Sequence, residues 1–204
     1  MAFYRDRVVP RLVNRLGAAA ALAPWREMVC EGLRGTIVEV GFGSGLNVPY
    51  YPTKLEHVYV VEPSDLAMKL AARRVRSARV PIERVGEDAH AMSLADECCD
   101  MALSSFTLCS VEDPDFVLRQ VWRVLRPGGQ YHFLEHGRAP GFALAHLQCA
   151  LDPLQRRLAG GCHLTRRPLE LVRDVGFELL WSEEGPTSGP RAWTYLSAGV
   201  AVKL

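Results

Sequence analysis

The sequence lacks the long apolar segments and the excess of one charge that define several classes of protein. No apolar run approaches the roughly 18 to 20 residues that a membrane-spanning helix needs. The 24 Lys and Arg residues nearly balance the 23 Asp and Glu residues, for a formal net charge of +1. Because so neutral a chain has no general attraction for polyanions, we expect no nucleic-acid partner. We also expect no stable membrane anchor.

Paired cysteine motifs are missing too, although the sequence contains 6 cysteines. No two of them form the C-x-x-C pair that is typical of zinc sites and redox centres. We therefore expect reduced thiols in the core or in a pocket, a cytoplasmic location and no metal site. The cysteines are Cys30, Cys98, Cys99, Cys109, Cys149 and Cys162.

The length of 204 residues fits one domain over residues 1–204 with a single large core. Residues 1–34 are expected to form an N-terminal helical segment, starting near Phe3 and broken near Gly17 and Pro24. Its apolar stripe either packs against the main domain or forms a lid over a substrate. Nothing in the pattern specifies an oligomeric state. The stripe consists of Val8, Val9, Leu12, Val13 and Leu16.

Short apolar runs alternate with helical patterns along the rest of the chain. This alternation predicts parallel βαβ units, and so an α/β fold with a doubly wound sheet. The last two strands are expected to form an antiparallel pair at one edge. Strands are predicted over 35–40, 57–62, 82–85, 101–104, 130–135, 177–182 and 192–202, and helices over 64–77, 113–125, 143–158 and 166–175.

The first of these strands runs into a glycine-rich turn, Gly41-Phe42-Gly43-Ser44-Gly45, and carries Glu39 just before it. Glycines let a backbone approach a ligand closely, but a carboxylate there repels the phosphates of a dinucleotide. The same carboxylate attracts an ammonium or sulfonium group. Leu46 also replaces the last glycine of G-x-G-x-x-G. The turn therefore favours S-adenosylmethionine (SAM) over NAD.

Three further acidic segments follow the ends of predicted strands. Glu62 lies 21 residues after Gly41, where a carboxylate can accept hydrogen bonds from two ribose hydroxyls. The alternative for Glu62 is a cap at the end of the strand, before a turn at Pro63. Glu87 or Asp88 could accept from the amine of adenine, and we favour Asp88. Glu135 is assigned no role.

Four ordered segments resemble the motifs of class I SAM-dependent methyltransferases. They are residues 38–45 (Val-Glu-Val-Gly-Phe-Gly-Ser-Gly), 61–63 (Val-Glu-Pro), 86–89 (Gly-Glu-Asp-Ala) and 125–129 (Leu-Arg-Pro-Gly-Gly). The resemblance implies a Rossmann-like sheet of order 3-2-1-4-5-7-6, mostly parallel with an antiparallel seventh strand and helices on both faces. It also implies SAM as methyl donor and S-adenosylhomocysteine as product. The implied cofactor residues are Glu39, Gly41, Phe42, Gly43, Gly45, Asn47, Glu62, Pro63, Glu87, Asp88, Ala89, Ser105 and Phe106.

A finer resemblance points to the small-thiol S-methyltransferase branch (methyltransferase-like 7 type). It rests on residues 47–52, 107–111, 134–136 and 161–166. Animal members of that branch begin with a hydrophobic anchor that has no match here, so their membrane location is not carried over. Glu62 stands where those members usually have Asp.

A thiol acceptor needs alignment and a fraction of thiolate rather than a strong base. His136 and His163 are the candidate catalytic residues, to assist deprotonation or orient the acceptor, although a structural role explains either equally well. Residues 138–167 are the expected cover over the substrate. Their apolar helix face predicts a small, neutral or lipophilic acceptor, and it consists of Phe142, Leu144, Leu147, Leu151 and Leu154.

Three alternatives stay open on the sequence. The chain could be a quinone-type C-methyltransferase, or an amine or phenol methyltransferase of the same architecture. It could instead bind SAM without turnover, as a sensor or partner subunit. A NAD-dependent oxidoreductase is disfavoured by Glu39 and Leu46.

Overall fold

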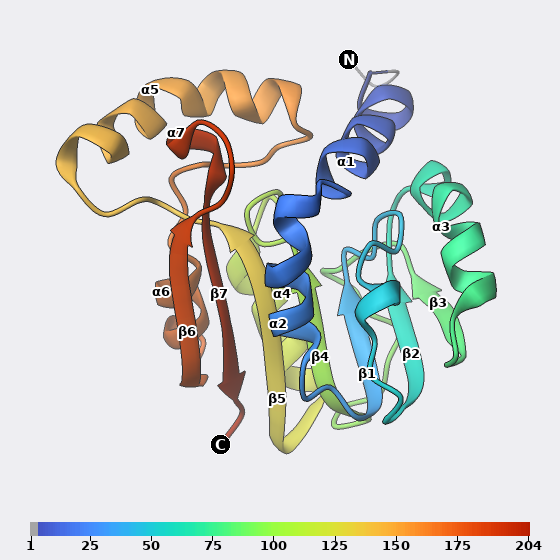
Figure 1. Ribbon diagram of the computed structural model, residues 1–204. Helices are drawn as coiled ribbons and strands as arrows, with labels where there is room; N and C mark the ends of the chain where they lie inside the picture. Colours follow the sequence, from blue (N-terminus) through green and yellow to red (C-terminus); the bar gives the residue numbers. More distant parts are fainter. Residues whose placement is uncertain (1–3) are drawn as a thin grey trace.

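The computed structural model describes residues 4–204, so the predicted helix start at Phe3 lies outside the described residues. A seven-stranded sheet of order β3-β2-β1-β4-β5-β7-β6 forms its centre (Figure 1). Only β7 runs antiparallel to its neighbours. The predicted fold class, strand order and antiparallel edge pair are confirmed. The strands are β1 (Gly35–Val40), β2 (Leu55–Val61), β3 (Ile82–Gly86), β4 (Cys99–Ser105), β5 (Leu125–His136), β6 (Glu178–Pro186) and β7 (Tyr195–Val202).

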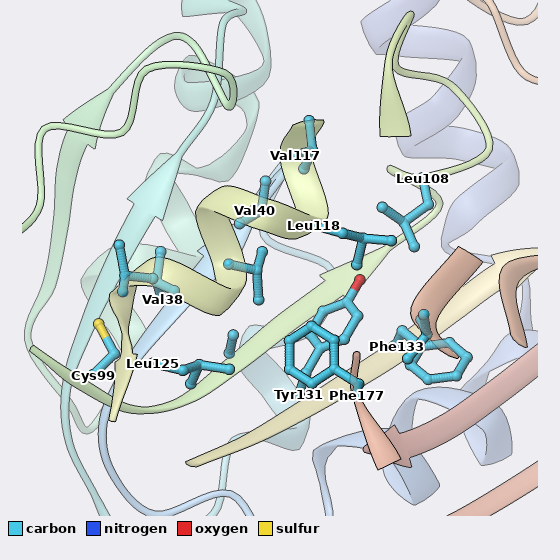
Figure 2. Close-up of a cluster of buried hydrophobic side chains, with 14 of the residues drawn as sticks. Val38, Val40, Cys99, Leu108, Val117, Leu118, Leu125, Tyr131, Phe133 and Phe177 are labelled. Atoms are coloured by element: carbon cyan, nitrogen blue, oxygen red, sulfur yellow. The ribbon is translucent and has the colours of Figure 1, made fainter. Parts of the chain in front are cut away.

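Helices cover both faces of the sheet because both faces are apolar. One face packs against Val29 and Cys30 of α2 and Ala71 of α3. The other packs against α4 and α6, and Figure 2 shows Val117 and Leu118 of α4 in this second cluster. The helices are α1 (Val9–Gly17), α2 (Ala23–Cys30), α3 (Asp65–Ser77), α4 (Pro114–Val124), α5 (Phe142–Leu158), α6 (Pro168–Asp174) and α7 (Arg191–Thr194).

Side-chain caps fix the starts of the two helices that follow β2 and β4. The Ser64 hydroxyl accepts from Ala67 N at 3.2 Å, and the Asp113 carboxylate accepts from Phe116 N at 3.0 Å. Each bond satisfies a backbone donor that the first turn leaves free. Both helices begin within one residue of the predicted positions.

Two predicted boundaries are wrong near the chain reversals. The fifth strand begins at Leu125 rather than at residue 130, and its register against β4 shifts between Cys99 and Met101. The last strand begins at Tyr195 rather than at residue 192, because the chain first makes the helical turn α7.

The α1 and α5 helices lie beyond the carboxyl ends of the parallel strands, at the top of Figure 1. The Tyr4 hydroxyl donates to Leu158 O at 2.9 Å, and this bond connects the first described residue to the end of α5. The N-terminal segment breaks between Gly17 and Ala23, as predicted. No residue of α1 is buried, so its stripe packs only in part. Within residues 4–204, no helix combines the length and the apolar character needed to cross a membrane.

The expected apolar inner face of α5 is wrong. Phe142, Leu147 and Leu154 are 88%, 47% and 54% exposed, while Leu144 and Leu151 are half-buried. The helix is held by polar residues instead. Buried Gln148 accepts from Ala139 N at 2.8 Å and donates to Gly137 O at 3.1 Å, and buried Asp152 accepts from Leu164 N at 2.7 Å.

Shortening a core side chain of α4 tests this packing. Leu118 is fully buried, so Leu118→Ala should lower the free energy of unfolding by about 2 to 5 kcal/mol. Phe116, on the same helix, is 44% exposed, and Phe116→Ala should cost less than about 1 kcal/mol. Urea unfolding followed by circular dichroism compares the two variants. Equal losses would contradict the assignment of this helix face to the core.

Candidate functional site

The glycine turn after β1 is shaped both by internal packing and by space for a ligand. Gly41, Gly43 and Gly45 have φ values of +73°, +57° and +72°, which side chains rarely tolerate. A Cβ at Gly41 would lie 2.0 Å from Thr107 Oγ1, and one at Gly45 would lie 3.0 Å from Phe42 Cζ. A Cβ at Gly43 would meet no atom closer than 3.9 Å. Gly43 therefore borders open space at this turn.

Glu39 lies at the centre of the site and is only 1% exposed. Its carboxylate accepts from Asn47 Nδ2 at 2.8 Å and from the Tyr51 hydroxyl. Burial raises the pKa of Glu39 to about 7, against the opposing effect of these two hydrogen bonds. Because the group is buried and close to titration at neutral pH, a cationic ligand would favour its charged form. No motif pointed to Tyr51 beyond its place in the segment 47–52.

Arg26 reaches the same site from α2. Its guanidinium donates to Asn47 Oδ1 at 2.6 Å and lies 5.5 Å from the centre of the Phe106 ring. Among the described residues, Arg26 Nε and Ser44 Oγ are buried and have no hydrogen-bond partner. Such groups are costly to leave unpaired, so they mark a place for a polar ligand. The sequence pattern did not single out Arg26.

Glu62 is attached to the glycine turn itself. Its two carboxylate oxygens accept from Gly43 N at 2.7 Å and from Ser64 N at 2.8 Å. Burial raises the pKa of Glu62, and these two backbone bonds oppose the rise. Because the carboxylate lies within hydrogen-bond reach of the turn, a ligand held by the turn can also reach Glu62. Pro63, the next residue, is exposed.

The acids after β3 lie at the surface. Asp88 accepts from His90 N at 2.8 Å, and this bond lowers the pKa of Asp88. Glu87 lies 3.4 Å from an Arg84 nitrogen. Ala89 packs against the hydrophobic cluster under α4. Either acid could meet a ligand, so both adenine assignments stay predictions.

The loop after β4 faces the site, and hydrogen bonds to Glu135 at the end of β5 hold it in place. Asn47 Nδ2 donates to Ser105 Oγ at 3.0 Å, and Phe106 has a positive φ of +57°. Fully buried Glu135 accepts from Thr107 N and Cys109 N, each at 3.0 Å. Glu135 thus positions the loop that begins with Phe106, directly after Ser105 at the end of β4.

Two cysteines and a histidine meet beside this loop. His136 Nδ1 lies 3.7 Å from Cys109 Sγ and 3.3 Å from Cys162 Sγ, and the two Sγ atoms are 3.6 Å apart. We call these residues the thiol–imidazole cluster. The His136 ring centre is 4.9 Å from that of Phe106, which puts the cluster next to the expected cofactor pocket. No spacing motif could foresee it, because Cys109 and Cys162 are 53 residues apart.

The second candidate histidine contacts α5 and the backbone of the loop after β4. His163 Nδ1 lies 3.4 Å from an Asp152 oxygen on α5, and His163 N donates to Cys109 O at 2.7 Å. Burial lowers the pKa of His163. These contacts favour a structural role for His163 and leave His136 as the candidate for chemistry.

The arrangement fits the expected SAM at three points. A buried carboxylate suits its ammonium group, and the unpaired Arg26 nitrogen suits its carboxylate. The open space at Gly43 leaves room for its body beside Glu62. Two surface cavities, of about 460 and 270 Å³, lie elsewhere, beside α2 and α6.

Comparisons with known proteins show which family the chain resembles. The family described as "Methyltransferase domain" matches residues 38–133. The human thiol S-methyltransferase TMT1A is 32% identical over 177 residues, which are 82% of this chain and 70% of that protein. The phosphatidylethanolamine N-methyltransferase of Cereibacter sphaeroides is 28% identical over 79% of this chain and 78% of its own.

A solved structure shares the fold. The N-methyltransferase NodS from Bradyrhizobium japonicum, solved with S-adenosylhomocysteine, superposes with a TM-score of 0.69 at 15% identity over 93% of this chain and 90% of that chain. The family match runs from Val38 in β1 to Phe133 in β5, and it includes the glycine turn and the acids after β2 and β3. Together with the identity to the human relative, it shows that this chain belongs to the class I SAM-dependent methyltransferases.

Proposed function

We propose that this enzyme methylates a thiol of a small molecule, forming a thioether and S-adenosylhomocysteine. The observation that carries the proposal is the 32% identity to a thiol S-methyltransferase over most of the chain. The buried thiol–imidazole cluster beside Phe106 adds support, because it offers soft, weakly polar groups where the acceptor would lie. The free cysteines of the described residues support a reducing, cytoplasmic location.

In this proposal the ends of β1 and β2 hold SAM. Glu39, oriented by Asn47 and Tyr51, binds the ammonium group, and Arg26 binds the carboxylate. Glu62 accepts from the ribose hydroxyls. The other residues proposed to contact SAM line the wall of its pocket or lie at its adenine. They are Gly41, Phe42, Gly43, Gly45, Pro63, Glu87, Asp88, Ala89, Ser105 and Phe106.

When bound, SAM supplies a methyl group on a positively charged sulfur that leaves as a neutral thioether. The chain has to align the acceptor sulfur with that methyl and to keep water out. His136 is placed to orient the thiol or to accept its proton, since its ring contacts Phe106. His163 supports the loop after β4 through its backbone bond to Cys109 O, while its ring contacts Asp152 of α5.

We further propose that residues 138–167 cover the acceptor, together with the described part of the N-terminal segment, residues 4–34. Gln148 and Asp152 fix α5 to the segments on either side of it. Leu144 and Leu151 of α5 are half-buried, which is consistent with a small or lipophilic acceptor. Tyr4 joins the two parts of the cover at Leu158.

A second candidate is methylation of an amine. The Cereibacter relative, named for phosphatidylethanolamine N-methylation, aligns over 79% of this chain. A quinone-type or phenol acceptor and SAM binding without turnover are the remaining alternatives from the sequence.

Incubation with SAM and matched panels of thiols, amines and phenols separates these functions. We expect methylated thiols to form at least about tenfold faster than products of the other classes, because a thiol needs little help from a base. Mass spectrometry of the products is the measurement. Turnover of amines alone would replace the proposal by the second candidate, and binding of SAM without any product would support a sensor.

Removing the Glu62 carboxylate tests the ribose assignment. Glu62→Ala should weaken SAM binding by about 10- to 100-fold, because hydrogen bonds to a charged group are lost. Glu83, an exposed acid on β3, is the matched control, and Glu83→Ala should leave the affinity within about twofold. Isothermal titration calorimetry gives both dissociation constants. An unchanged affinity in Glu62→Ala would refute the assignment.

The raised pKa of Glu39 predicts that SAM binds more weakly in acid. Below its pKa of about 7 the free protein carries a proton on Glu39, and that proton must leave before an ammonium group can bind. Affinity should therefore fall by up to about tenfold per pH unit below 7. Arg26 stays charged and Tyr51 stays neutral over this range, because burial raises the pKa of Tyr51.

Calorimetry between about pH 5.5 and pH 7.5 measures this dependence. Glu62 contributes in the same direction, since burial also raises its pKa, so the control retains it. Glu39→Gln should bind weakly at every pH and show a flatter profile. A wild-type affinity that stays constant from acid to neutral pH would exclude Glu39 as the ammonium partner.

A further inference from the structure

We propose that Cys109, His136 and Cys162 bind a zinc ion and that the acceptor thiolate takes its open fourth coordination position. The second half rests on the proposed function, whereas the metal site stands without it. The proposal departs from the expectation of no metal, which rested on the absence of a spacing motif. The fold brings the three ligands together from the loop after β4, the end of β5 and the segment after α5.

The distances within the thiol–imidazole cluster match a tetrahedral metal. Two thiolates at about 2.3 Å from a tetrahedral zinc stand about 3.8 Å apart, and a thiolate and an imidazole nitrogen about 3.6 Å apart. The observed distances are 3.6 Å between the sulfurs, and 3.3 and 3.7 Å from His136 Nδ1 to each sulfur. All three ligand atoms lie within 4.8 Å of one another.

The charges also suit a buried divalent ion. Cys109 is fully buried and Cys162 is 4% exposed, and an isolated ion is costly in such a place. Two thiolates and a neutral imidazole cancel the charge of Zn²⁺. Two neighbouring residues, Glu135 and Arg166, also carry opposite charges. Glu135 accepts from Cys109 N, and the Arg166 guanidinium donates to Leu108 O on the same loop.

Three protein ligands leave one position free, which is the pattern of catalytic rather than structural zinc. The cluster itself lies next to the expected cofactor pocket, because the His136 ring centre is 4.9 Å from that of Phe106. Soft ligands such as a thiolate are favoured at a site that already holds two thiolates. The substrate class that fits this position is therefore a small thiol.

The step balances without a further reactant. The acceptor thiol binds the metal as a thiolate, and its proton leaves to water. A carbon–sulfur bond then forms to the methyl as the carbon–sulfur bond of the sulfonium breaks, and the bonding pair stays on the sulfur of S-adenosylhomocysteine. The neutral thioether is a weaker ligand and dissociates. His136 acts in this arrangement as a ligand and not as a base.

Cobalt(II) makes the site visible by absorption spectroscopy. Titration of the chelator-treated, reduced protein with Co²⁺ should saturate at one equivalent. It should give thiolate-to-cobalt charge-transfer bands and the intense visible bands of tetrahedral cobalt. Zn²⁺ should abolish them. This measurement needs no variant. Absence of a stoichiometric thiolate–cobalt spectrum would overturn the metal site, as would a Cys109–Cys162 disulfide found by mass spectrometry in protein purified with reductant.

Variants identify the ligands. Cys109→Ser and Cys162→Ser should each halve the charge-transfer intensity and weaken cobalt binding at least about tenfold. Cys149, an exposed cysteine on α5, is the matched control, and Cys149→Ser should leave the spectrum unchanged. Circular dichroism checks that each variant is folded. A full spectrum in either ligand variant would refute the assignment.

Addition of a substrate thiol to the cobalt form, without SAM, tests the fourth position. We expect a third thiolate band and a shift of the visible bands, and an unchanged spectrum would refute thiolate coordination. The outcome is distinguishable from failure of the proposed function. Cobalt binding in an enzyme that methylates amines and no thiol would overturn thiol methylation and leave the metal site intact.

Discussion

The site depends on one buried carboxylate and the groups that keep it in place. Glu39 ends an apolar strand, where an unpaired charge would be costly. Asn47 and Tyr51 satisfy its oxygens, and Arg26 lies close enough to favour its charged form. Asn47 also bonds to Ser105 and to Arg26, so one amide connects the first strand, the end of the fourth strand and the second helix.

Much of the fold and part of the site could be predicted from the sequence, because these features follow from local chemistry. The strands read as apolar runs, and the helix starts are set by Ser64 and Asp113. The glycine turn needs positive φ at Gly41, Gly43 and Gly45. Parallel strands end at the same edge of a sheet, so acids at their ends converge. The strand order itself came from resemblance rather than from periodicity.

The remaining features of the site and the packing of α5 depend on contacts between segments that are distant in the sequence, and residue spacing does not encode such contacts. Arg26 looked like any helical arginine, and Tyr51 like a loop aromatic. Apolar spacing predicts a buried face on the helix after β5, whereas Gln148 and Asp152 hold that helix by hydrogen bonds to backbone. His136 and the two cysteines come together only in the folded chain, because they belong to three separate segments.

The Arg26 side chain has a consequence for how the molecule responds to its methyl donor. The same guanidinium that faces the pocket also donates to Gly17 O at 3.3 Å, at the end of α1. Val29 and Cys30, on the same short helix, are part of the core. In the proposed complex, a methyl donor bound at this guanidinium is linked to the end of α1 through a single side chain. Whatever changes the position of that end of α1 then also changes the affinity for the donor, and the reverse holds by the same factor.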